Sequence, residues 1–141
     1  FRNNCYVVSN CKLYPQLENP EKAHPLGAFY DTPHGVANAL LLPYVMEYNA
    51  ESPSRAKYLD IARAMGVDTA GMSVDESVAA AVGAVRDLSL SIGIPQRLHE
   101  IGVREEDIPA LAVAAFNDVC TGGNPRPTSV EDIAALYETA Y

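Results

Sequence analysis

The chain has no run of apolar residues long enough to cross a membrane, which takes about 20 in succession. It also lacks an excess of basic residues: 10 lysines and arginines stand against 18 aspartates and glutamates, a formal net charge of -8. Nucleic acids and anionic membranes are bound through clustered positive charge, so neither is an expected partner. The first residues lead into no signal-like apolar stretch, and we therefore expect a cytoplasmic protein.

Cysteine is scarce too. Cys5, Cys11 and Cys120 cannot all pair, and none lies in a Cys-x-x-Cys arrangement, so neither a disulfide framework nor a structural zinc site is indicated. A glycine-rich turn between a strand and a helix, which would cradle the phosphates of a dinucleotide, is also missing. The pair Gly122-Gly123 follows a predicted helix and does not meet that description.

What the chain has in abundance is helical patterning. Its 141 residues suit one domain that buries about 68–70% of its unfolded surface. Apolar residues recur at helical spacing between serine caps, glycines and prolines, and the stripe of the longest helix includes Leu88 and Leu90. We predict an all-α bundle of five or six helices, with helical segments near residues 38–48, 53–66, 74–92, 96–100, 107–118 and 130–141.

Two features qualify this prediction. The segment 38–48 is apolar on all sides, which indicates a buried helix, and Pro43 should bend it. Residues 1–22 carry asparagines and prolines that interrupt regular structure, so we expect an irregular arm with room for one short strand at 6–8. The predicted division is an arm over 1–22 and a helical domain over 23–141.

Two of the three histidines, His24 and His34, bracket an aromatic turn that opens the apolar helix. Imidazole is a natural metal ligand, but a metal site with a position open to substrate uses at least three protein ligands. From spacing alone, the pair is either part of a metal site or structural. His99 is expected at the surface, Asn38 as a helix cap, and the acidic cluster 105–107 as a helix start favoured by the dipole.

The run from Ala23 to Ala39, with the loop Cys120–Arg126, resembles the iron-containing alcohol dehydrogenases, in particular the lactaldehyde reductase (propanediol oxidoreductase) branch. The resemblance covers about residues 23–141. It implies the dehydroquinate synthase-like helical C-terminal domain of that family. It also implies an enzyme that interconverts small alcohols and aldehydes, such as propanediol and lactaldehyde, with NAD and a divalent metal, iron first and zinc second.

The same resemblance assigns roles to particular residues. His34 matches a metal ligand, and His24 matches a histidine near the substrate and nicotinamide that is suited to proton relay. Phe29 and Cys120 match the lining of the substrate cleft, although Cys120 alone reads equally well as a small buried residue at a helix end. Pro20 stands where the family has another ligand histidine, and the ligands farther upstream have no counterpart.

Two functions therefore compete. The chain is either the metal-side half of an oxidoreductase, working with a separate nucleotide-binding chain, or a non-catalytic helical remnant or interaction module. We expect it to be inactive alone and to hold neither iron, zinc nor NAD tightly. The apolar residues that a missing domain would leave exposed also predict a homo-oligomer.

Overall fold

The computed structural model describes residues 30, 32–117 and 123–141, and in these parts of the chain all regular structure is helical. The all-α prediction is thus confirmed. None of these helices is long and apolar enough to cross a membrane. The helical elements are α2 (His34–Asn49), η1 (Pro53–Lys57), α3 (Tyr58–Ala64), α4 (Val74–Ser91), η2 (Leu98–Ile101), η3 (Glu105–Asp107), α5 (Ile108–Phe116) and α6 (Val130–Ala140), where η marks a 3-10 helix.

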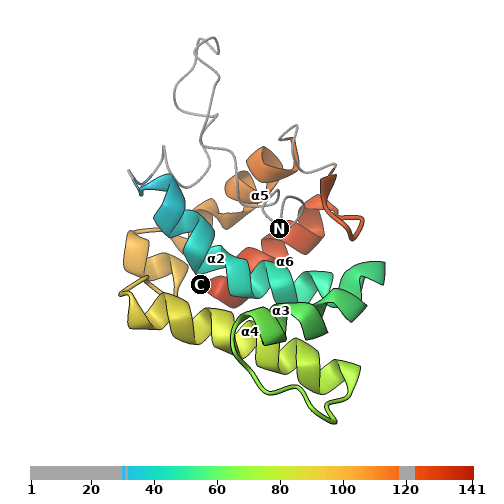
Figure 1. Cartoon of the computed structure of the whole chain (residues 1–141). Helices are drawn as coiled ribbons and strands as arrows, with labels where there is room; N and C mark the ends of the chain where they lie inside the picture. Colours follow the sequence, from blue (N-terminus) through green and yellow to red (C-terminus); the bar gives the residue numbers. More distant parts are fainter. Residues whose placement is uncertain (1–29, 31, 118–122) are drawn as a thin grey trace.

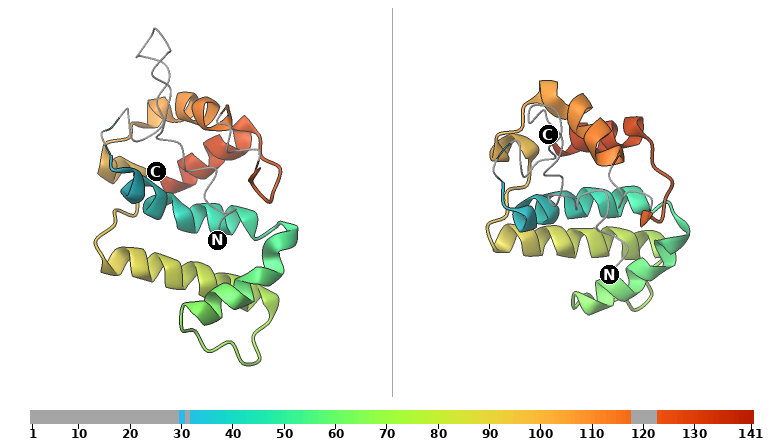
Figure 2. Two further views of the ribbon diagram at one scale, coloured as in Figure 1. Left: turned by 45° about the horizontal axis from the view of Figure 1, so that its top comes forward. Right: turned by 90° about the horizontal axis from the view of Figure 1, so that it is seen from above.

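The helices are arranged around α2. Helices α3 and α4 pack together on one side of it, and α5 and α6 pack together on the other (Figures 1 and 2). α4 and α6 both contact α2 directly. The long apolar helix therefore lies in the middle of the described fold, as its sequence indicated.

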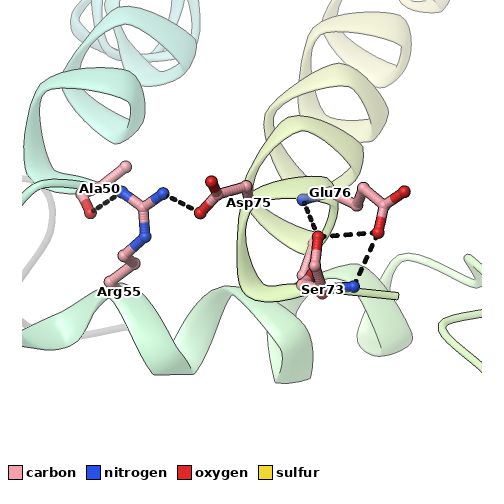
Figure 3. Close-up of polar contacts among 6 residues, drawn as sticks. Ala50, Arg55, Ser73, Asp75 and Glu76 are labelled. Carbon is pink, nitrogen blue, oxygen red and sulfur yellow. Dashed lines mark hydrogen bonds and ion pairs between the residues drawn. The ribbon is translucent and has the colours of Figure 1, made fainter. Parts of the chain in front are cut away.

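Local capping explains where α4 and α6 begin. The Ser73 hydroxyl accepts the Glu76 amide at 3.2 Å, while the Glu76 carboxylate accepts the Ser73 amide at 2.8 Å (Figure 3). Ser129 and Asp132 repeat this reciprocal arrangement at 3.1 and 2.9 Å. Such capping boxes satisfy amides that the first helical turn leaves without partners. Both were predicted from the serine and the acidic residue three positions later.

The start of α2 is different. The helix opens at His34, and the amides of Val36 and Ala37 donate to the Pro33 carbonyl at 2.9 and 3.1 Å. Asn38 lies inside the helix, so its prediction as a cap was wrong. The cap position belongs to Pro33, whose fixed φ of -54° suits the entry to a helix.

Two hydrophobic clusters share α2. One is formed by residues of α2, η2, α5 and α6, and the other by residues of α2, α3 and α4. Leu41 in the first cluster is 0% exposed, and Tyr58 in the second donates its hydroxyl to the Met46 carbonyl. A helix that contacts a core on each side buries apolar residues on both faces, which explains the all-round apolar sequence of α2.

Candidate functional site

Only one of the predicted site residues lies in the described part of the chain. His34 is the first residue of α2. His24, Phe29 and Cys120 lie outside the described residues, as does the predicted arm over 1–22. Their assignments therefore stay predictions. Two described segments adjoin these residues in sequence: the entry to α2, and the loop 123–128.

The entry to α2 is held by a clamp formed by Tyr30, Arg104 and Asp107. The Tyr30 hydroxyl donates to the Asp107 carboxylate, and its oxygen accepts the Arg104 backbone amide at 3.5 Å. The Arg104 side chain donates to both carboxylate oxygens of Asp107, at 2.8 and 3.0 Å. The clamp thus joins the segment before α2 to η3 and the start of α5.

The clamp shifts the pKa of its members. The Tyr30 hydrogen bond, followed by the Arg104 hydrogen bonds, lowers the pKa of Asp107 below its ordinary value. Burial, followed by the bond to Asp107, raises the pKa of Tyr30. At neutral pH the pair is therefore a protonated phenol donating to a charged carboxylate, which is a strong form of hydrogen bond. Asp107, predicted only as part of an acidic helix start, therefore also binds the segment before α2 through Tyr30.

Loop 123–128, which follows the Cys120 segment in sequence, is anchored to the C-terminal end of α2. The side-chain amides of Asn49 and Asn124 exchange two hydrogen bonds, each 2.9 Å long. Asn124 also donates to the Arg126 carbonyl at 2.7 Å and to the Thr128 hydroxyl at 3.1 Å. Because Asn49 is 1% exposed, this amide pair fixes the loop through a polar contact largely shielded from water.

Arg126 makes the second anchor of the loop. Its guanidinium lies over the Tyr48 ring, 4.1 Å from the ring centre, and donates to the Tyr48 carbonyl at 2.9 Å. It also forms an ion pair with Glu51 at 3.0 Å. The Tyr48 hydroxyl in turn donates to the Pro127 carbonyl at 2.8 Å. Cation–π contact and directed hydrogen bonds together hold the loop 123–128 against the C-terminal end of α2 before α6 begins.

A groove of about 370 Å³ lies between α2 and α6, lined by Tyr44, Glu47, Tyr48, Arg126, Asp132, Ala135, Leu136 and Thr139. The charged groups on its wall already have partners within the fold. Glu47 pairs with Arg86 at 3.0 Å, Arg126 pairs with Glu51, and Asp132 caps α6. Their contacts serve the packing of helices, and we assign the groove no role in the reaction.

His99 lies on η2, away from the entry to α2 in sequence, and it is exposed as predicted. Its Nδ1 is hydrogen-bonded to the carbonyl oxygen of Tyr141, and the two rings meet edge to face with centres 5.6 Å apart. His99 therefore serves to attach the C-terminal end of α6 to η2.

A metal site needs at least three donor side chains close together. Within the described ranges, no group of three or more histidine, cysteine, aspartate or glutamate side chains could hold a metal ion. Pro20 stands at a position where the resemblance implies a ligand histidine. We therefore derive no reaction step through a metal held by this chain alone.

Comparison with known proteins places this arrangement in a family. Residues 21–141 match the model described as the Fe-containing alcohol dehydrogenase family, C-terminal. Over 119 residues, the chain is 63% identical to the lactaldehyde reductase of Escherichia coli strain K12. The aligned residues make up 84% of this chain and 31% of that protein. The 1,3-propanediol dehydrogenase of Klebsiella pneumoniae is 44% identical over 84% of this chain and 30% of its own length.

Solved structures agree with the sequence comparisons. A 1,3-propanediol oxidoreductase superposes with a TM-score of 0.79 at 43% identity, over 82% of this chain and 30% of that one. An alcohol dehydrogenase from Oenococcus oeni gives 0.78 at 39% identity, with the same coverage of 82% and 30%. The chain thus spans less than a third of the length of these relatives. By its family match and its fold, it belongs to the iron-containing alcohol dehydrogenases and corresponds to a C-terminal portion of them.

Proposed function

We propose that this chain is the metal-side helical portion of an iron-containing alcohol dehydrogenase that interconverts a small alcohol and its aldehyde, with propanediol and lactaldehyde as the first substrate pair to test. The observation that carries the proposal is the 63% identity to a lactaldehyde reductase over 84% of the chain. The TM-score of 0.79 to a propanediol oxidoreductase supports it independently through the fold.

The cofactors of the proposed enzyme are NAD and iron, with zinc as the alternative metal. Within this chain, His34 at the start of α2 would be one metal ligand, and His24 would relay a proton near the substrate. Phe29 and Cys120 would line the substrate cleft. The remaining metal ligands and the dinucleotide site would come from a separate nucleotide-binding chain, so the chain by itself is expected to be inactive.

A chimera tests this proposal. Residues 23–141 of this chain would replace the matching C-terminal segment of the E. coli lactaldehyde reductase, which supplies its own nucleotide-binding portion and upstream ligands. We expect the chimera, loaded with iron(II), to reduce NAD with propanediol. His34→Ala should abolish turnover, whereas His99→Ala should retain it because the His99 hydrogen bond is to Tyr141, at the C-terminal end of α6. A folded chimera without activity, or one insensitive to His34→Ala, would contradict the proposal.

The isolated chain provides the second arm of the test. One matched ligand, or two with His24, falls short of the three or four that such metal sites use, so zinc titrated calorimetrically should bind no tighter than about micromolar. With added iron, propanediol and NAD, no reduced cofactor should form. Stoichiometric tight binding that is lost in His34→Ala would show that this chain holds a complete site, and would favour an independent enzyme over a portion of one.

A further inference from the structure

The first turn of α2 receives little help from its own sequence. Its cap residue, Pro33, has no side-chain hydrogen bond to offer, and the first turn contains no acidic residue to complement the helix dipole. The starts of α4 and α6 have both of these features, in Ser73 and Ser129 and the acidic residues after them. Because caps and first-turn carboxylates stabilise a helix start locally, the start of α2 depends on contacts from elsewhere in the fold.

The Tyr30 clamp supplies such contacts four residues before His34. Besides the bonds of the hydroxyl group, the Tyr30 ring packs against the core cluster shared by α2, α5 and α6. The Tyr30 carbonyl accepts the Thr32 hydroxyl at 3.4 Å, and Thr32 is itself buried, with 8% of its surface exposed. Each residue extends the chain by at most about 3.6 Å, so holding Tyr30 limits where the first residue of α2 can lie.

The segment from Gly102 to Asp107 forms the other side of the clamp. Gly102 ends η2 with a φ of +87°, a left-handed conformation that turns the backbone toward Arg104. A side-chain carbon at Gly102 would lie 3.8 Å from the Tyr30 ring, which shows how closely this turn passes the tyrosine. Asp107 is then oriented by two hydrogen bonds from Arg104. The carboxylate that accepts the Tyr30 hydroxyl is therefore also held by Arg104.

We propose that Tyr30 and Asp107 are positioning residues of the metal-side site: their hydrogen bond fixes the direction in which the chain enters α2, and thereby the place of His34. This inference rests on the proposed function for the role of His34 as a ligand. The effect of the clamp on the helix start itself needs no metal, cofactor or partner, and can be measured separately.

Hydrogen exchange of the Val36 and Ala37 amides measures that effect, because these amides make the first hydrogen bonds of α2. In the full chain, Tyr30→Phe should raise their exchange rates by roughly tenfold or more, the factor expected for losing a hydrogen bond to a charged group, and leave α4 unchanged. Tyr44→Phe is the matched control. It removes a hydroxyl bond from the middle of α2 to the Gln96 carbonyl, 2.8 Å long, and should leave Val36 and Ala37 unaffected.

A second variant tests whether Asp107 is the partner that matters. Asp107→Ala should raise the same two exchange rates, and combining it with Tyr30→Phe should add little, because both changes remove one interaction. Two outcomes for Tyr30→Phe would overturn the proposal. In one, the exchange rates of Val36 and Ala37 stay within twofold of those in the unmodified chain. In the other, the rates rise equally throughout α4.

The active chimera gives the readout that separates positioning from general stability. There, Tyr30→Phe should lower the iron retained per subunit and kcat, with KM for propanediol little changed, whereas Tyr44→Phe should change none of the three. Faster exchange with full iron retention and kcat would show that the clamp stabilises the helix start without positioning His34, and would overturn the proposal. If the unmodified chimera is inactive, the proposed function fails, and a tenfold rise in exchange then still supports the clamp as the device that fixes the helix start.

Discussion

Replacing Asn49 with alanine should loosen the anchor between α2 and the loop 123–128. The substitution removes both hydrogen bonds of the Asn49–Asn124 pair. A typical hydrogen bond contributes about 1 kcal/mol net to stability, so the two together should contribute about 2 kcal/mol. Asn124 keeps its bonds to Arg126 and Thr128 and is only half-buried, so water can replace the lost partner and the cost should not rise far above this value.

Urea unfolding followed by circular dichroism provides the assay. The midpoint should fall for Asn49→Ala while the slope with urea stays constant, because the same surface is exposed on unfolding. Asn117→Ala is the control, since Asn117 is exposed and surface substitutions of this kind change stability by less than about 0.5 kcal/mol. A loss in Asn49→Ala no larger than in this control would refute the idea that the buried amide pair anchors the loop.

Two further predictions concern stability. Leu41→Ala removes a side chain that is 0% exposed in the core of α2, α5 and α6, and should cost about 3–5 kcal/mol by chemical unfolding; a loss below about 1 kcal/mol would contradict the packing described. The pKa of Glu76 lies below its ordinary 4.5 because the Ser73 amide, and then the Ser73 hydroxyl, donate to its carboxylate. The charged carboxylate therefore contributes to stability above about pH 4.5, and this contribution is lost as the pH falls through the lowered pKa of the folded state. Thermal unfolding from neutral pH to about pH 3 should therefore show a smaller acid loss in Glu76→Gln than in the unmodified chain, and equal losses would contradict this assignment.

The parts of the fold that could be predicted from sequence are those set by residues close together in the chain. A serine followed three residues later by Glu76 or Asp132 contains the whole capping interaction, so the starts of α4 and α6 were predictable. The predicted helix over 53–66 has its expected extent but begins as the 3-10 turn η1 before α3. Local patterns do not distinguish the two helix types well, because both continue with similar backbone angles.

Contacts between distant residues could not be predicted in this way. Tyr30 and Asp107 are 77 positions apart, and Asn49 and Asn124 are 75 apart, so no local spacing links them. Periodicity also placed Leu88 and Leu90 on an apolar stripe, but they are 51% and 61% exposed. Ser89 between them is buried, at 6%, so a small polar residue occupies the inward face of the last turn of α4.

The candidate site shows the same division between motif and geometry. The motif predicted that His34 opens the apolar helix, and the structure confirms that placement. The roles of His24, Phe29 and Cys120 stay predictions that follow from the family, because those residues lie outside the described part of the chain. The clamp on the helix entry carries no motif, and only the fold shows it.

The position of α2 between two cores has an evolutionary consequence. Of its residues whose burial is described, only Gly35 and Glu47 are exposed, so almost every substitution in this helix must satisfy neighbours on one side or the other. A substitution on the outer face of α4, which reaches water, meets few neighbours. A substitution at a buried position of α2 changes the packing against another helix, and which helix that is depends on the face concerned. We therefore expect the sequence of α2, which begins with His34, to diverge slowly.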